Sequence, residues 1–335
     1  MKHNLDKQSP LQIGGQAVIE GVTMRAPGML ATAVRRKTGE ILVKKTPFIS
    51  VGERFKLFRM PVFRGAAGLI EMMVIGVRTL NYSAEIAMED ADTVHGGKDD
   101  GQMEVPAKKK ETVKLGLTVI VSLFLGVAIF FVTPIVATTL LFGIDQQPLA
   151  FNLAAGGMRI ALLLAYLGLL SLSKDIRRLF QYHGAEHKAV FAFERGEQLT
   201  AVAAGRQSRF HPRCGTSFLL IVMFSAILLF SLLDAWMIQL FGTLDIVTRL
   251  VTHLPLIPLV GGISYEFIKA SARRSETLFG RLVIAPGLWL QRITTNEPDE
   301  GQLEVAIVAL RCALGEDEGE VLSTIHVQEG GLVSP

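Results

Sequence analysis

This chain contains few cysteines and carries only a small net charge. Two cysteines, Cys214 and Cys312, occur among 335 residues, which excludes a fold held together by a network of disulfide bonds. The formal net charge of +3 is too small to indicate a nucleic-acid-binding protein. Residues 1–10 are polar and lack an apolar segment, so no cleavable signal peptide is expected, and no internal repeat is found.

Hydrophobic residues make up half of the chain, and they are concentrated in long segments almost without charge. A helix needs about 20 mainly apolar residues to cross a hydrocarbon layer roughly 30 Å thick. Four segments are long enough, at residues 115–141, 149–172, 218–241 and 250–268. The sequence therefore predicts an α-helical integral membrane protein with about four transmembrane helices in a lipid bilayer.

Lysine and arginine are found on one set of the connections between these segments. The connections near Asp145 and Asp245 carry little positive charge. The basic positions that flank the other ends are Lys108, Lys109, Lys110, Lys114, Lys174, Arg177, Arg178, Lys188, Arg195, Arg206, Arg209, Arg213, Lys269, Arg273, Arg274 and Arg281. Because basic loops remain in the cytoplasm, the sequence predicts a multi-pass protein of the cytoplasmic membrane with both termini in the cytosol.

The remaining segments predict smaller elements. Residues 29–48 are typical of a β-hairpin, and residues 61–88 of an amphipathic helix. Residues 282–290 are apolar but too short to cross, which indicates an interfacial or re-entrant segment, and residues 302–314 predict an amphipathic helix that must dock on a partner. The expected organisation is a cytosolic α+β N-terminal region at residues 1–110, a membrane domain at residues 111–290 with a cytosolic loop at residues 174–216, and a cytosolic C-terminal helix and tail at residues 291–335.

Most of the candidate functional residues lie in the connection between the second and third segments. His183 and His187 are four residues apart, so on a helix both imidazoles share a face and can bind one metal ion. Glu186 stands beside them, in the order His-x-x-Glu-His of the inverzincin metallopeptidases. His211 and Cys214 follow on a segment that Pro212 keeps out of a regular helix. The match to inverzincins is partial, because those enzymes have a further acidic ligand downstream and the sequence pattern singles out no such residue here.

Three interpretations of this cluster remain open. In a catalytic site, His183, His187 and Cys214 bind zinc, the expected divalent ion, and Glu186 acts as general base. In a structural site, His211 completes a closed set of four ligands. In the third interpretation no metal binds, and the histidines pair with carboxylates or phosphates.

Two further interpretations concern groups outside this cluster. The glycine-containing segment 14–21 predicts a tight turn that enters the hairpin, since it lacks the order of a phosphate-binding loop. Gln16, Glu20 and Arg25 are weaker candidates for reaching the metal cluster. The four spans hold few ionisable residues at mid-depth, which disfavours a transporter of charged substrates.

Four sequence blocks, in order, resemble the YqhQ-like family of bacterial membrane proteins (domain of unknown function 1385). These blocks are Gly14–Arg25, Tyr182–Lys188, His211–Ser217, and Pro286–Gln291 with Thr294, Thr295 and residues 298–300. The resemblance implies a membrane protein that is a predicted metal-dependent enzyme. The chain departs from the family pattern at Thr23, where we expect methionine.

The expected function is metal-dependent hydrolysis of a membrane-associated substrate at the cytoplasmic membrane surface. Glu186 is the expected general base, and His183, His187, His211 and Cys214 form the expected metal site. The alternative is a non-enzymatic membrane scaffold or assembly factor in which the metal is structural.

Overall fold

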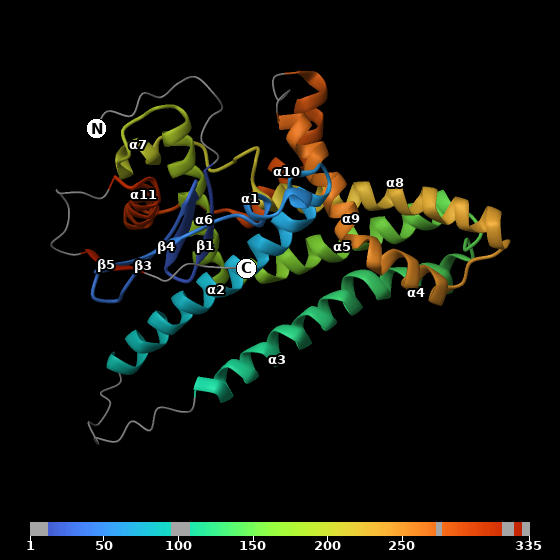
Figure 1. Cartoon of the computed structure of the whole chain (residues 1–335), viewed down its shortest axis with the longest axis horizontal. Helices are drawn as coiled ribbons and strands as arrows, with labels where there is room; N and C mark the ends of the chain where they lie inside the picture. The colour runs from blue at the N-terminus through green and yellow to red at the C-terminus, as the bar shows by residue number, and fades with distance from the viewer. Residues whose placement is uncertain (1–12, 95–107, 273–276, 317–324, 330–335) are drawn as a thin grey trace.

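The computed structural model describes residues 13–94, 108–272, 277–316 and 325–329 (Figure 1). Long helices project from one end of a unit that contains a β-sheet and several shorter helices (Figure 1). This division follows the separation of apolar and charged segments in the sequence.

The prediction of four transmembrane helices is confirmed. Within the described residues, four helices are long and apolar enough to cross a membrane, with mean hydropathy between 1.6 and 2.6. The spans are Ile120–Phe142, Pro148–Leu170, Gly215–Phe241 and Ile246–Ser271. They are formed by α3 (Lys108–Val127) with the π-helical turn η2 (Ala128–Val132) and α4 (Thr133–Phe142), by α5 (Pro148–Leu170), by α8 (Gly215–Phe241) and by α9 (Ile246–Ala272).

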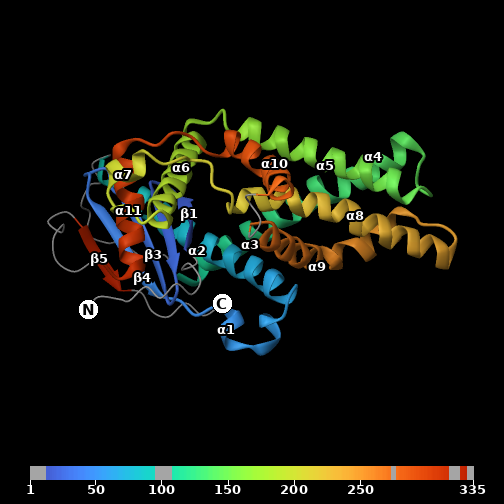
Figure 2. The same ribbon diagram turned by 90° about the horizontal axis from the view of Figure 1, so that it is seen from above.

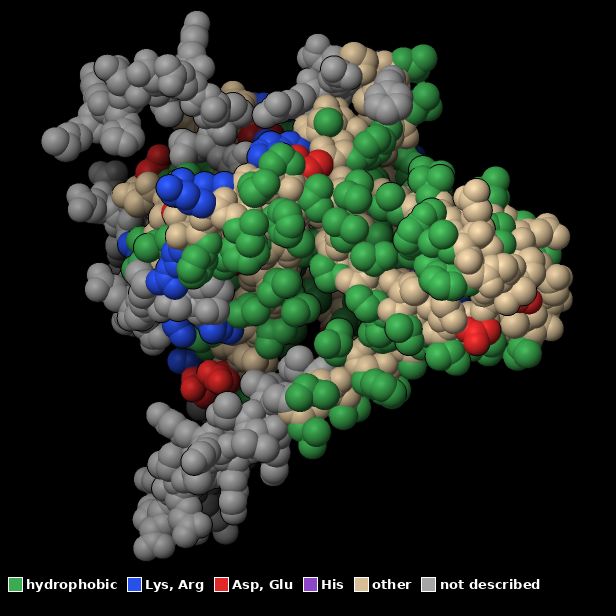
Figure 3. All heavy atoms as spheres, turned by 45° about the vertical axis from the view of Figure 1, so that its right-hand side comes forward, with side chains coloured by type: hydrophobic (Ala, Val, Ile, Leu, Met, Phe, Trp, Pro, Cys, Tyr) green, Lys and Arg blue, Asp and Glu red, His purple; other side chains and the backbone are tan. Residues whose placement is uncertain are grey.

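The surface of these helices is suited to lipid. Phe124, Leu140 and Leu232 are each about 70% exposed, which in water would leave large apolar areas unburied. Figure 3 shows hydrophobic side chains over much of this face, with few charged ones among them. The chain is therefore a membrane protein whose spans contact the bilayer.

Beside the spans lies a five-stranded sheet in the order β1-β2-β3-β4-β5. The strands are β1 (Gly14–Val18), β2 (Gly21–Ala26), β3 (Met29–Arg35), β4 (Ile41–Pro47) and β5 (Ile325–Glu329). The first four are antiparallel neighbours, whereas β5 is parallel to β4. The hairpin expected at residues 29–48 is present as β3 and β4.

The glycine-containing segment 14–21 is a strand as well as a turn. Gly14 and Gly15 lie in β1, and the chain reverses at Ile19 and Glu20, where Glu20 has a positive φ of 52°. Few residues in β1 have high strand propensity, so the pattern alone indicated only the turn.

Helices cover both faces of the sheet (Figure 2). Alternate residues such as Val22, Met24 and Val43 pack with α6 (Lys174–Glu194) and α11 (Glu300–Leu314) on one face. On the other face Val18, Val34 and Leu42 pack with α2 (Phe63–Val94). This alternation is the two-residue period of a strand that is buried on both sides.

The C-terminal amphipathic helix docks on the N-terminal sheet. Asp299 caps α11 through a reciprocal capping box with Gln302, and the apolar side of α11 is buried against β2 and β3. Segments predicted as separate regions, at residues 1–110 and 291–335, thus share one hydrophobic core.

Four further helices complete the described chain. They are α1 (Val51–Arg54), η1 (Lys56–Arg59), α7 (Ala201–Gly205) and α10 (Leu278–Thr294). The segment 282–290, expected to be interfacial or re-entrant, lies in α10, which packs against α8 and α9. The spans also contain buried charged side chains, of which Arg159 lies near the middle of α5, while Asp234 and Arg249 lie nearer the ends of α8 and α9.

We predict that Leu310→Ala weakens the contact between α11 and the sheet. Leu310 is fully buried in that core, and removal of a buried leucine side chain costs about 2–5 kcal/mol. The melting temperature in detergent should fall clearly. Val202→Ala, at an exposed position of α7, is the control and should melt like the wild type. Equal melting temperatures for all three proteins would contradict this account.

Candidate metal centre

Helix α6 presents the two motif histidines on one face, as predicted. The ring centroids of His183 and His187 are 4.4 Å apart. Gly184 lies between them. A larger residue does not fit at this position, because a Cβ atom would come within 2.2 Å of the Asn296 carbonyl oxygen. Glycine in a helix interior costs about 1 kcal/mol, and here it permits close contact with the segment that joins α10 to α11.

The segment containing Pro212 lies between α7 and α8 and brings Cys214 to the histidines. Cys214 is the N-cap residue of α8, and its Sγ accepts a hydrogen bond from the Thr216 backbone N–H (3.4 Å). His183 Nε2 lies 3.2 Å from this sulfur. Ligand atoms of His183, His187 and Cys214 all lie within 4.8 Å of one another, so three of the expected ligands converge.

Backbone carbonyl groups determine which ring nitrogens face the sulfur. His183 Nδ1 donates to the Thr294 carbonyl oxygen (2.8 Å), and His187 Nδ1 donates to that of Arg209 (2.5 Å). A carbonyl oxygen can only accept, so in a neutral ring the proton is on Nδ1 and the lone pair is on Nε2. This is the arrangement of metal-binding histidines, whose second nitrogen is commonly held by a carbonyl or carboxylate.

His187 Nε2 provides a test of whether a metal fits. It is one of the buried side-chain nitrogen and oxygen atoms in the described chain that have no hydrogen-bond partner. Burial lowers the pKa of His187, which favours the neutral ring that a metal requires. Two imidazoles and a thiol are a typical zinc ligand set, so the residues present fit the ion.

Glu186 lies next to this group and is shielded from water. Its carboxylate is 3.6 Å from His187 Nε2, and the residue is 6% exposed. Burial raises the pKa of Glu186, while His183, His211 and the Gly15 backbone N–H act in the opposite direction. A carboxyl group with a raised pKa is a better proton acceptor at neutral pH than an ordinary one.

His211 is not a member of the three-residue group. Its Nε2 lies 3.4 Å from the Glu194 carboxylate, and its Nδ1 accepts from the Arg213 backbone N–H (3.3 Å). The ring is 5.6 Å from that of His187, between centroids. Both nitrogens therefore have partners outside the cluster, and His211 is placed in the surrounding layer.

The three weaker candidates lie apart from the cluster. Gln16 donates to Thr79 (2.7 Å), and Arg25 lies 3.8 Å from Glu71. Glu20 accepts hydrogen bonds from Arg178 and Tyr182, and burial, together with the Glu20 carboxylate, raises the pKa of Tyr182. The glycine segment instead reaches the site through Gly15.

Gly15 is the residue of β1 that covers the acid. A Cβ atom there would come within 2.9 Å of Glu186 Cγ and 2.5 Å of the Thr23 carbonyl oxygen. Only a residue without a side chain allows β1 to cover Glu186 so closely.

Gln291 in α10 holds the segment before Cys214 in place and was not predicted to do so. Its Oε1 accepts from the His211 backbone N–H, and its Nε2 donates to the His211 carbonyl oxygen, both at 2.8 Å. The same nitrogen donates to Ser217 Oγ (2.9 Å), and Gln291 is fully buried. The sequence feature that could have identified Gln291 was the block at residues 286–300. This block contains Gln291 and Thr294 but does not reveal what they contact.

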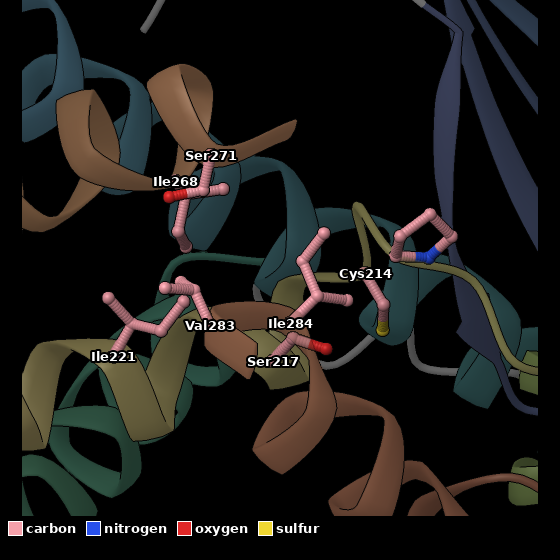
Figure 4. Close-up of a pocket in the computed structure, with 8 residues that line it drawn as sticks. Cys214, Ser217, Ile221, Ile268, Ser271, Val283 and Ile284 are labelled. Carbon is pink, nitrogen blue, oxygen red and sulfur yellow. The ribbon is translucent and has the colours of Figure 1, made fainter. Parts of the chain in front are cut away.

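A small pocket lies directly beside Cys214. It is lined by Pro212, Cys214, Ser217, Ile221, Ile268, Ser271, Val283 and Ile284. Cys214 and Ile221 stand at opposite ends of the labelled side chains (Figure 4). These residues come from the segment before α8 and from α8, α9 and α10, so the pocket joins the cluster to the membrane-spanning part.

We predict that Gln291→Leu loosens the segment that carries Cys214. The change leaves the His211 backbone N–H and the Ser217 hydroxyl unpaired, at about 1–3 kcal/mol for each buried group, while the His211 carbonyl oxygen keeps the Cys214 backbone N–H as a donor. In a Cys312→Ser background, the buried Cys214 thiol should react faster with a maleimide. Gln198→Leu, at an exposed position, is the control. Unchanged labelling rates would show that Gln291 does not hold this segment.

Comparison with known proteins agrees with the resemblance of the sequence blocks. The family described as "Protein of unknown function (DUF1385)" matches residues 60–316, which include His183, His187 and Cys214. The chain is 32% identical over 305 residues to "Uncharacterized protein YqhQ" of Bacillus subtilis (strain 168), covering 89% of this chain and 91% of that protein. No solved structure matches the chain. The chain therefore belongs to the YqhQ-like family of membrane proteins with the DUF1385 domain.

Proposed function

We propose that this protein is a zinc-dependent hydrolase that acts on a membrane-associated substrate at the cytoplasmic surface of the membrane. The observation that carries the proposal is the buried Nε2 of His187, which has no hydrogen-bond partner among the described residues and lies in one group with His183 and Cys214. Three ligands and one open position are typical of catalytic zinc sites, whereas structural sites use four protein ligands.

The residues of the site have separate roles in this proposal. His183, His187 and Cys214 hold the ion, which when bound supplies Lewis-acid chemistry. Glu186 takes the proton from the attacking water, because its carboxylate is near the ligand nitrogens and has a raised pKa. His211 and Glu194 contact each other outside this three-residue group and support the segment that carries Cys214.

The position of the cluster supports a substrate from the membrane. Cys214 begins α8, a membrane-spanning helix, and the adjoining pocket is lined by Ile221, Ile268 and Ile284. The pocket is small, but its apolar lining places the cluster next to the membrane-spanning part of the chain. The basic residues between the second and third spans support a cytosolic location of this end and of both termini.

A second candidate function is a membrane scaffold or assembly factor with a structural metal. It is favoured by the way the cluster links three parts of the chain, namely α6, the segment before α8, and α10 through the Thr294 carbonyl group. A metal bound at this cluster would hold the sheet-containing unit in a fixed position against the membrane-spanning bundle.

We predict about one zinc ion per chain in the purified wild-type protein, measured by elemental analysis. His187→Ala and Cys214→Ser should each lose the metal because each removes a ligand. Cys312→Ser is the matched control for Cys214→Ser, since Cys312 is also buried but packs in the sheet core. Wild-type protein without stoichiometric metal would refute both candidate functions.

We predict that Glu186→Gln retains zinc and folded yield but loses hydrolysis by about 100- to 10,000-fold. The zinc-loaded protein is incubated with a total membrane extract of the producing cells, and new products are measured by mass spectrometry. Glu20→Gln, a carboxylate that binds Arg178 away from the cluster, is the control and should keep activity. Loss of metal in Glu186→Gln would make Glu186 a ligand, and products independent of Glu186 would favour the scaffold.

A further inference from the structure

A second polar cluster lies within the membrane-spanning bundle. Its central carboxylate, Asp234 in α8, accepts hydrogen bonds from Asn152 Nδ2 (2.8 Å) and Arg249 Nε (3.1 Å). His253 Nε2 lies 2.8 Å from the other oxygen. Asp234 and Arg249 are at most 1% exposed, and Arg249 also contacts Asp145 in the loop between α4 and α5. Both oxygens of Asp234 therefore already have partners.

Arg159 lies deeper in the same bundle. It is eleven residues from each end of α5, which at about 1.5 Å per residue places it near the middle of the span. It is 6% exposed, and its Cζ lies 4.8 Å from the ring centroid of Phe131, a cation–π contact. Its Nε and Nη2 are buried, and neither has a hydrogen-bond partner among the described residues.

The same two nitrogens bind carboxylates elsewhere in this chain. Arg64 uses Nε and Nη2 to hold both oxygens of Glu266, and Arg178 uses the same pair to hold both oxygens of Glu20. These nitrogens form one edge of the planar guanidinium, which matches a carboxylate or a phosphate. In Arg159 this edge is buried, and no described residue supplies an acceptor for it.

Other unpaired polar atoms belong to the same part of the bundle. His253 Nδ1 is buried and unpartnered, and its ring stacks on Phe230, which contacts Phe131 below Arg159. The Thr138 hydroxyl, in α4, is also buried and unpartnered. Of seven such atoms in the described chain, four therefore lie within the spans, and Phe131 itself is in the π-helical turn η2. Such turns in helices are frequent at functional sites.

We infer that the membrane bundle contains a binding site for a carboxylate or phosphate group, held by the Nε and Nη2 edge of Arg159. An arginine at mid-depth without a contacting anion is costly, and a bound oxyanion offsets that cost through two charge-assisted hydrogen bonds. The ligand is a small soluble anion, because a lipid headgroup lies at the bilayer surface, far from a residue near the middle of the span. This site is separate from the metal centre and does not depend on it.

Thermal unfolding of the full-length protein in a non-ionic detergent tests the site. Inorganic phosphate and acetate are titrated as soluble probes, and phosphatidylglycerol is compared with phosphatidylcholine in mixed micelles as the lipid probe. A ligand that binds the folded state raises the melting temperature in a concentration-dependent manner. A response to phosphate or acetate identifies a soluble anion, and a response to phosphatidylglycerol alone would overturn the inference, because a headgroup at the bilayer surface does not reach Arg159.

The variants separate this site from general charge effects. Arg159→Met should weaken the apparent affinity by about 10- to 100-fold, and Arg159→Lys, which keeps the charge but lacks the two-nitrogen edge, should also weaken it. Arg292→Met, at an exposed position, should respond like the wild type, as should His187→Ala at the metal centre. The inference is overturned if no anion stabilises the wild type, or if both Arg159 variants that fold respond as the wild type does.

Discussion

The hydrogen bonds from two imidazole Nδ1 atoms to backbone carbonyl groups are the interactions on which the candidate metal centre depends. Thr294 at the end of α10 and Arg209 before α8 supply these carbonyls, so the lone pairs of His183 and His187 turn toward Cys214. The carbonyls are in place only because α6, the segment before α8, and α10 pack together. The chemistry of the site is therefore a property of three segments distant in sequence.

The same constraint applies to both polar clusters. A buried polar atom needs a hydrogen-bond partner. At the end of the bundle beside the sheet, the unpartnered atom is an imidazole nitrogen in a group with a thiol, which suits a cation. Within the bundle, the unpartnered atoms include one edge of the Arg159 guanidinium, which suits an anion. The chain thus presents two candidate sites of opposite preference, a proposed cation site at the end of its membrane spans and a proposed anion site within them.

The sheet-containing unit supports the candidate metal centre from the other side. Gly15 in β1 approaches Glu186, and α11 packs on the sheet face that also receives α6. The sequence predicted that the last amphipathic helix needed a partner, and it predicted the hairpin at residues 29–48. It did not predict β1, β2 or β5, since β1 is rich in glycine and the pairing of β5 with β4 joins opposite ends of the chain. Long-range pairing of this kind leaves no local signal.

The sequence by itself determined the four spans, because the length of an apolar run is a local property that the bilayer thickness selects. It also determined that His183 and His187 share a helix face, because their spacing equals one turn. Only the tertiary structure decided that Cys214 joins them while His211 turns to Glu194, and that Gln291 holds the intervening segment. It also decided that the Nε and Nη2 edge of Arg159 has no acceptor while Arg249 reaches Asp234. These outcomes depend on distances between segments that are far apart in the chain, and such distances exist only after the helices have packed.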